Sequence, residues 1–186
     1  YKEKVLGTDL NATNPYYTLN RISNQTEKDR FISTVNVRWN ILDGLFVQAK
    51  AGQDFYTFNT HKIVPEGTGY RPNGQIDQTG MNFWERNFEG LIGLDKKLNE
   101  NFGLAVNLGG NLMSQHRTTT TIVGSGFVLP QFHVINNTAT RNTTTGLYDK
   151  KINSVFATAE LSYKQYLFLN LTGRNDWFST LNPKSN

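Results

Sequence analysis

The chain contains no cysteine and no long hydrophobic run, and few of its residues are charged. Without cysteine, neither a disulfide framework nor a thiolate metal site can form. Without a run of about 18 apolar residues, the sequence predicts no transmembrane helix. Hydrophobic residues make up 37% and charged residues 18%, and these low values together argue against both a helical enzyme and a charged disordered tail. The remainder is largely Asn, Thr, Ser, Gln and Gly, which suits strands that meet water with alternate residues.

The positive charge is too dispersed to indicate a nucleic-acid partner. The formal net charge is +4, but lysine and arginine occur singly or in pairs rather than in a patch. The length of 186 residues allows one ordinary domain. The first residues, Tyr1-Lys2-Glu3-Lys4, resemble neither an initiator methionine nor a signal peptide, and the last six resemble a loop. We therefore expect an internal segment of a larger protein.

Alternation between apolar and polar residues is the strongest pattern in the chain. From Phe31 to Ile41 the odd positions are mostly apolar, and the even positions are mostly polar. A period of two places these two sets on opposite faces of a strand. A tight turn at Leu42-Asp43-Gly44 precedes a second alternating segment. The apolar residues of the two segments are Phe31, Val35, Val37, Trp39, Ile41, Leu45, Val47, Ala49 and Ala51.

About six such strands are predicted, in three hairpins over residues 31–58, 83–112 and 152–174. The turns near Asp43, Asn99 and Lys164 are short, whereas long loops are predicted from His61 to Gly80 and from Ser114 to about Lys151. Strands of about ten residues match a tilted crossing of a bilayer. Short turns at one end and long loops at the other are typical of outer-membrane barrels. The predicted fold is therefore all-β, an antiparallel up-and-down transmembrane β-barrel segment.

Six strands alone would leave two open edges, and unpaired backbone groups in hydrocarbon cost several kcal/mol each. The polar face carries charged residues such as Arg38, Lys50, Glu85, Glu89 and Glu160, so it cannot form a dry core. Closure with further strands satisfies both constraints. We expect residues 1–186 to form part of one transmembrane β-barrel domain, about a quarter of a wall of about 22 strands.

Three segments carry motifs that resemble those of one known protein family. The first is Asn14-Pro15-Tyr16-Tyr17-Thr18-Leu19 followed by Asp29-Arg30-Phe31-Ile32, which looks like the family's start of a strand, with Tyr17 where tryptophan is usual. The second runs from Gly126-Phe127-Val128-Leu129-Pro130 through Ile135-Asn136-Asn137 to Asn153-Ser154-Val155-Phe156. The third joins Tyr163-Lys164-Gln165-Tyr166-Leu167 to Gly173-Arg174-Asn175-Asp176-Trp177-Phe178-Ser179-Thr180-Leu181. Together they span nearly the whole chain and resemble the SusC/RagA family of TonB-dependent outer-membrane transporters.

The resemblance implies a 22-stranded barrel with an internal plug in the bacterial outer membrane. It also implies energy input through the TonB complex, import of oligosaccharides or peptides, and a SusD-like surface lipoprotein as partner. The plug domain and the TonB box are not recognisable in this chain, so contact with the TonB complex would involve other parts of the parent protein. Outer-membrane lipid is the expected neighbour of the apolar face.

No catalytic, cofactor or metal site is predicted. His61, His116 and His133 fall in or beside the predicted loops and lack metal-ligand spacing. Glu85 and Glu89 share a strand face, but four residues along a strand span about 13 Å, too far for a glycosidase pair. A non-enzymatic binding role remains. Long outer loops are where ligands meet such barrels, and the predicted ligand contacts are Tyr70, Arg71, Phe127, Phe132 and His133. For each of them, simple loop packing is the alternative.

A second hypothesis is a soluble all-β adhesin or carbohydrate-binding module whose strands form a sandwich. A sandwich packs its apolar face against a second sheet, whereas an importer wall turns that face to lipid. Folding in the absence of detergent would distinguish the two.

Overall fold

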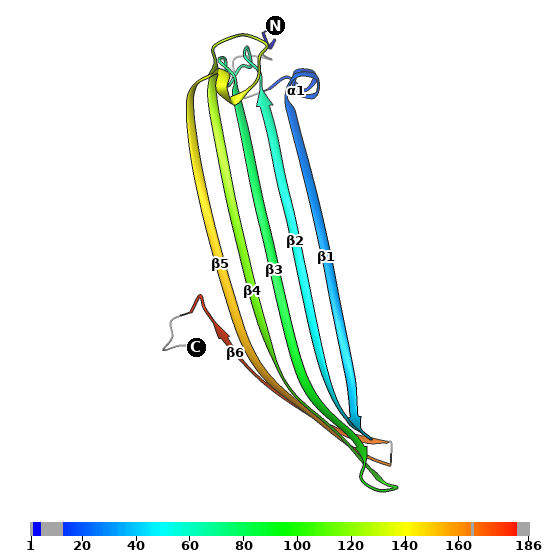
Figure 1. Ribbon diagram of the computed structural model, residues 1–186. Coiled ribbons are helices and arrows are strands. Elements are labelled where there is room, and N and C mark those ends of the chain that lie inside the picture. Colours follow the sequence, from blue (N-terminus) through cyan, green and yellow to red (C-terminus); the bar gives the residue numbers. More distant parts are fainter. Residues whose placement is uncertain (1, 5–12, 165, 182–186) are drawn as a thin grey trace. The chain divides into compact units, whose positions relative to one another are not determined.

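Six strands form one open antiparallel sheet in the order β1-β2-β3-β4-β5-β6 (Figure 1). The computed structural model describes residues 2–4, 13–164 and 166–181. The strands are β1 (Ser23–Leu42), β2 (Leu45–Val64), β3 (Gln75–Lys97), β4 (Phe102–Phe127), β5 (Thr138–Tyr163) and β6 (Leu167–Phe178). The helix α1 (Pro15–Arg21) precedes β1, and a short 3-10 helix, η1 (Ile135–Asn137), precedes β5. The sequential order confirms the predicted up-and-down topology.

In the part of the chain that the structure describes, no helix is long and apolar enough to cross a membrane.

The strands are longer than the predicted ten residues, and the predicted long loops were wrong in extent. β1 to β5 span 20 to 26 residues each. The connections are reduced to residues 65–74 and 128–137, so His61 lies in β2 and His116 in β4. The polar runs 118–121 and 142–145 belong to β4 and β5, because β-branched threonine suits a strand. The segment with Pro65, Gly67, Pro72 and Gly74 remains a loop, as proline and glycine density predicts, and residues 128–134 remain a second one.

The chain divides into two compact units; β1 to β5 have residues in both, and β6 belongs to one of them. The loop unit comprises Tyr1–Arg30, Tyr56–Phe83 and Arg117–Leu147, and it carries α1 and both long connections. The turn unit comprises Phe31–Phe55, Trp84–His116 and Tyr148–Asn186, and it carries the three short turns. Each unit is described separately below.

The short turns follow from local backbone chemistry. Gly44 adopts φ +76°, a left-handed conformation that glycine reaches without strain, and its carbonyl accepts a hydrogen bond from the Asp95 amide at 2.7 Å. In the β3–β4 turn, the Asn99 side chain accepts hydrogen bonds from the backbone amides of Asn101 and Phe102 at 2.9 Å. Side-chain capping of this kind is why asparagine favours turns. These turns set the strand pairing of the hairpins.

The segment before β1, which resembles the family's entry into a strand, forms helix α1, and β1 follows it. Asn14 caps the helix, because its side chain accepts a hydrogen bond from the Tyr16 amide at 3.0 Å. Pro15 occupies the first turn, where its missing N–H is not needed. The helix ends at Arg21, and the Asp29-Arg30-Phe31 motif lies within β1.

The turn unit has two chemically distinct faces and no sealed core. On one face, apolar side chains remain exposed: Val35 by 63%, Val37 by 60% and Leu169 by 54%. Val106, on the same face, is half-buried. Among the described residues, the buried hydrophobic side chains are Phe46, Val64, Ile76 and Phe83. The apolar face predicted from the alternation is therefore present and is uncovered in this chain.

Two aromatic rings on the polar face of the turn unit lie over glycines of a neighbouring strand. A side chain at Gly93 would overlap the Phe46 ring, and a Cβ at Gly109 would lie 2.6 Å from the Phe156 ring. The Arg38 guanidinium lies 3.6 Å from the Phe46 ring centroid on the same face. Glycine in these positions thus makes room for a ring that covers otherwise bare backbone, a known way to stabilise strand glycines.

This arrangement makes Gly93→Ala destabilising. The new methyl group must displace the Phe46 ring and with it the contact to Arg38, at a cost of about 1–3 kcal/mol in the free energy of unfolding. Urea unfolding of the full-length protein, followed by tryptophan fluorescence, measures the change. Gly90→Ala in the same strand is the matched control, because nothing lies within 4 Å of its Cβ position. Equal stability of both variants would contradict the proposed packing.

Candidate functional site

The loop unit ends in a cluster formed by residues 2–4, α1 and the connections 65–74 and 128–137, which we call the loop cluster (Figure 1). Its centre is buried. Glu3 is 8% exposed, and its carboxylate accepts hydrogen bonds from the amides of Asn14 at 2.6 Å and Gly69 at 2.8 Å. Thr68 is fully buried and lies 3.2 Å from the Tyr17 hydroxyl. The contacts of Glu3 with Gly69 and of Thr68 with Tyr17 join segments that are more than fifty residues apart.

Glu66 joins the two connections of the loop cluster. One carboxylate oxygen accepts a hydrogen bond from the Gln131 amide at 2.8 Å, and the other lies 2.8 Å from His133 Nε2. Burial favours the neutral carboxyl, but the hydrogen bonds from Gln131 and His133 outweigh it and lower the pKa of Glu66 below its ordinary value of 4.5. The ionised form of Glu66 therefore holds residues 128–137 against residues 65–74.

All five predicted ligand-contact residues lie in the loop unit, and the structure divides them into groups. Tyr70 and Arg71 line one hollow of about 510 Å³. Phe127 and His133 contact each other, with ring centroids 4.7 Å apart. Phe132 is 53% exposed, and its carbonyl accepts a hydrogen bond from the Asn137 side chain at 2.6 Å. Phe127 and His133 thus take part in loop packing, whereas Phe132 is exposed and Tyr70 and Arg71 line a hollow.

The hollow at Tyr70 and Arg71 has chemistry suited to a polar ligand. Its other lining residues are Pro72, Asn73, Gly74, Gln75, Ser125, Gly126, Ala139 and Thr140. The Arg71 Nε donates a hydrogen bond to Gln75 Oε1 at 3.0 Å, and Gln75 donates in turn to Asp77 at 2.7 Å. This relay orients the guanidinium and leaves its two terminal nitrogens available for a carboxylate or hydroxyl group.

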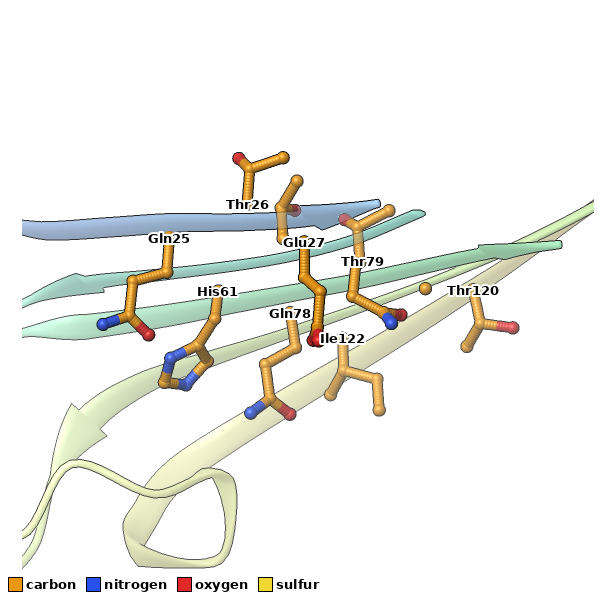
Figure 2. Close-up of a pocket in the computed structure, with 11 residues that line it drawn as sticks. Gln25, Thr26, Glu27, His61, Gln78, Thr79, Thr120 and Ile122 are labelled. Atoms are coloured by element: carbon orange, nitrogen blue, oxygen red, sulfur yellow. The ribbon is translucent and has the colours of Figure 1, made fainter. Parts of the chain in front are cut away.

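A second hollow in the loop unit, of about 920 Å³, was not predicted from the sequence. It lies across β1 to β4 and is lined by Gln25, Thr26, Glu27, Asn59, Thr60, His61, Gln78, Thr79, Gly80, Thr120 and Ile122. Figure 2 shows Gln25, His61 and Gln78 projecting to one side of their strands, with Thr26 on the other side. Alternation along the polar strand extensions could have revealed the hollow, but most of these positions were assigned to loops. Amide, hydroxyl and imidazole groups can bind neutral polar ligands here.

The polar face of the turn unit carries a groove of about 330 Å³. Its side chains include Thr34, Lys50, Asp54, Asn87 and Glu89. On the same face, Asn107 donates a hydrogen bond to Thr158 at 3.1 Å. Charges of both signs with amides and hydroxyls form a surface that water or a polar solute can wet.

In the described residue ranges, no group of three or more His, Asp or Glu side chains could hold a metal ion. His116 Nδ1 lies 2.6 Å from Asp149 Oδ1, a pair that joins β4 to β5 in the turn unit. Glu85 accepts a hydrogen bond from Asn87 at 2.8 Å.

These features define a class of structure: a wall segment of an antiparallel β-barrel, apolar on one face and polar on the other. No protein-family model and no curated protein sequence matches the chain. Solved structures do match. The chain is similar to a chain of the RagAB peptide transporter, with a TM-score of 0.83 and 15% identity, covering 93% of this chain and 20% of that one. It is also similar to the RagAB peptide importer in the "closed-closed" state, with a TM-score of 0.82, 15% identity, and coverage of 93% and 20%.

A third structure, the RagAB importer in the "open-open" state, matches with a TM-score of 0.80 and 16% identity, covering 90% of this chain and 19% of that one. The chain thus spans about a fifth of the length of the transporter chains that it matches. The likeness confirms the fold predicted from the alternation and the resemblance: six antiparallel strands that match part of a larger barrel.

The loop-cluster geometry predicts a pH-dependent contact. Because the folded-state pKa of Glu66 is lowered, its stabilising effect is present above pH 4.5 and is lost as the pH falls through the lowered value. Hydrogen exchange of the Gln131 amide, corrected for its intrinsic rate, should therefore accelerate at acidic pH. Glu66→Gln should lose about 1 kcal/mol of local protection already at pH 7. Glu100→Gln, in the exposed β3–β4 turn, is the control, and equal protection in both variants would refute the role of Glu66.

Proposed function

We propose that this chain is part of the barrel wall of a TonB-dependent nutrient importer in the bacterial outer membrane, of the SusC type. It imports glycans or peptides together with a SusD-like lipoprotein partner. It is not an enzyme. The plug and the segment that contacts the TonB complex belong to other parts of the parent protein.

The observation that carries this proposal is the two-faced sheet of the turn unit. Exposed apolar side chains on one face, including Val35, Val37 and Leu169, suit contact with acyl chains. The opposite face carries the polar groove with Lys50, Asp54 and Glu89, which suits an aqueous interior. The fold likeness to chains of the RagAB peptide importer supports a transport role.

A soluble sandwich fits the structure less well. It needs a second sheet over the apolar face, and among the described residues one six-stranded sheet accounts for all named strands. The edge strands β1 and β6 each need a further strand, since an open edge in hydrocarbon leaves backbone groups unsatisfied. Closure in a barrel of about 22 strands, of which residues 1–186 form one part, meets this need.

The loop unit supplies the proposed ligand contacts. Tyr70 and Arg71 at their shared hollow, with the exposed Phe132, would meet an incoming saccharide or peptide. Aromatic faces pack on sugar or side-chain surfaces, and the guanidinium binds carboxylate or hydroxyl groups. Phe127 and His133 would act indirectly, by holding the connection 128–137 in place beside those contacts.

The orientation of the sheet can be tested with a charge on each face of β4. Leu108→Arg puts a cation on the apolar face and should lower the free energy of unfolding in lipid vesicles by about 2–4 kcal/mol. Asn111→Arg, on the polar face, should change it by less than about 1 kcal/mol. Urea titration of the full-length protein in vesicles measures both. Equal effects, or a folded monomer in buffer without detergent, would favour the soluble alternative.

Import can be tested at Arg71. Arg71→Ala should reduce the uptake of labelled oligopeptides or oligosaccharides about fivefold at subsaturating concentration, because about 1 kcal/mol of ligand binding is lost. Arg141→Ala, an exposed position on β5 in the same unit, is the matched control. If cells that carry Arg71→Ala take up ligand normally, at equal amounts of folded protein, Arg71 is not one of the ligand contacts.

A further inference from the structure

Three aromatic or cationic side chains meet at the border of the apolar face in the turn unit. The Arg86 guanidinium lies over the Trp84 ring, 4.8 Å from its centroid, and the His116 ring stacks on Trp84 at 5.6 Å. His116 is in turn paired with Asp149. The stack therefore joins β3, β4 and β5, and Arg86 is its exposed end.

The Arg86 guanidinium has N–H donors that can bind a further group. Among the described residues its recorded partner is the Trp84 ring, and no carboxylate pairs with it. A guanidinium that stacks on a ring keeps its in-plane N–H donors free, in a fork that matches the oxygens of a phosphate group. The nearby carboxylate of Asp149 is held by His116 at 2.6 Å.

The apolar face beside this stack is hollowed. A depression of about 660 Å³ is lined there by the apolar residues Val35, Val37, Ala49, Ala51, Phe88, Gly90, Gly110, Leu112, Val155 and Trp177. Phe88 follows Arg86 by two residues in β3, so alternation places both on the same face, about 7 Å apart. Phe88, which lines the apolar hollow, is thus the next residue after Arg86 on this face of β3.

We propose that Arg86, with Trp84 and the adjoining hollow, forms a binding site for an anionic phospholipid. The lipid phosphate accepts hydrogen bonds from the Arg86 guanidinium, and an acyl chain occupies the hollow between Val37 and Leu112. A free phosphate ion could use the cation alone, but it has no use for the apolar hollow, so the geometry favours a lipid. This inference rests on the proposed function, because it requires the apolar face to meet a membrane.

The test uses the full-length protein in a neutral detergent, with lipid binding followed by native mass spectrometry. Dioleoyl phosphatidylglycerol is the probe, dioleoylglycerol lacks the phosphate, and inorganic phosphate lacks the acyl chains. Arg86→Gln should weaken phosphatidylglycerol binding about fivefold, the effect of one arginine near an anionic lipid surface. Arg86→Lys should restore only part of it, because an ammonium group keeps the charge but lacks the planar fork that stacks on Trp84. Dioleoylglycerol should bind the wild type and Arg86→Gln equally.

Arg38→Gln is the matched control, because Arg38 also lies over a ring, that of Phe46, but on the polar face. It should leave lipid binding unchanged. Equal phosphatidylglycerol affinity of folded Arg86→Gln and wild type, or displacement of the lipid by inorganic phosphate, would overturn the site while leaving the importer proposal intact. Failure of the wild-type protein to insert into vesicles of any composition would overturn both.

Discussion

Hydrogen bonding between neighbouring strands is the constraint on which the rest of this structure depends. The buried hydrophobic side chains named above number four, too few to hold a sheet of this extent by burial. The strands are joined by their backbones, as in the continuous pairing of Ile152 with Phe178 through Tyr163 with Leu167. Because backbone hydrogen bonds hold the strands together, the side chains are free to face two different surroundings. The apolar face can meet hydrocarbon and the polar face water, because neither has to supply a core.

Where side chains of this chain pack tightly, they either cover glycine positions in the strands or join loops. Phe46 and Phe156 lie over Gly93 and Gly109, so rings occupy the space that two missing side chains leave. In the loop unit, Glu3 and Glu66 bind backbone amides that have no strand partner. Buried polar groups need hydrogen-bond partners. One carboxylate can accept hydrogen bonds from two amides, because it has two acceptor oxygens. Local order in the loops therefore depends on charge, whereas order in the strands depends on the backbone.

The hairpins were predictable, but the sites were only partly so. Alternation located the two-faced strands around Val35, Val106 and Leu169, and Asp43-Gly44 marked a turn. The same method ended β2 and β4 too early, because residues such as Asn59 and Thr120 are polar on a stretch without apolar alternation. For this reason the hollow at Gln25, His61 and Gln78 was missed. Tyr70 and Arg71 do share a hollow, as their loop position suggested, whereas the role of Glu66 gave no signal because its partners are more than sixty residues away.

The sequence by itself determined which side chains share a face and where the chain reverses, since both depend on neighbours within a few residues. A period of two and a glycine in a left-handed turn are local properties of the backbone. Only the tertiary structure decided how far the strands continue and which loop residues meet, because both depend on partners from distant segments. The polar extensions remain strands through hydrogen bonds to adjacent strands, and Glu66 orders residues 128–137 through charge-assisted contacts across the fold.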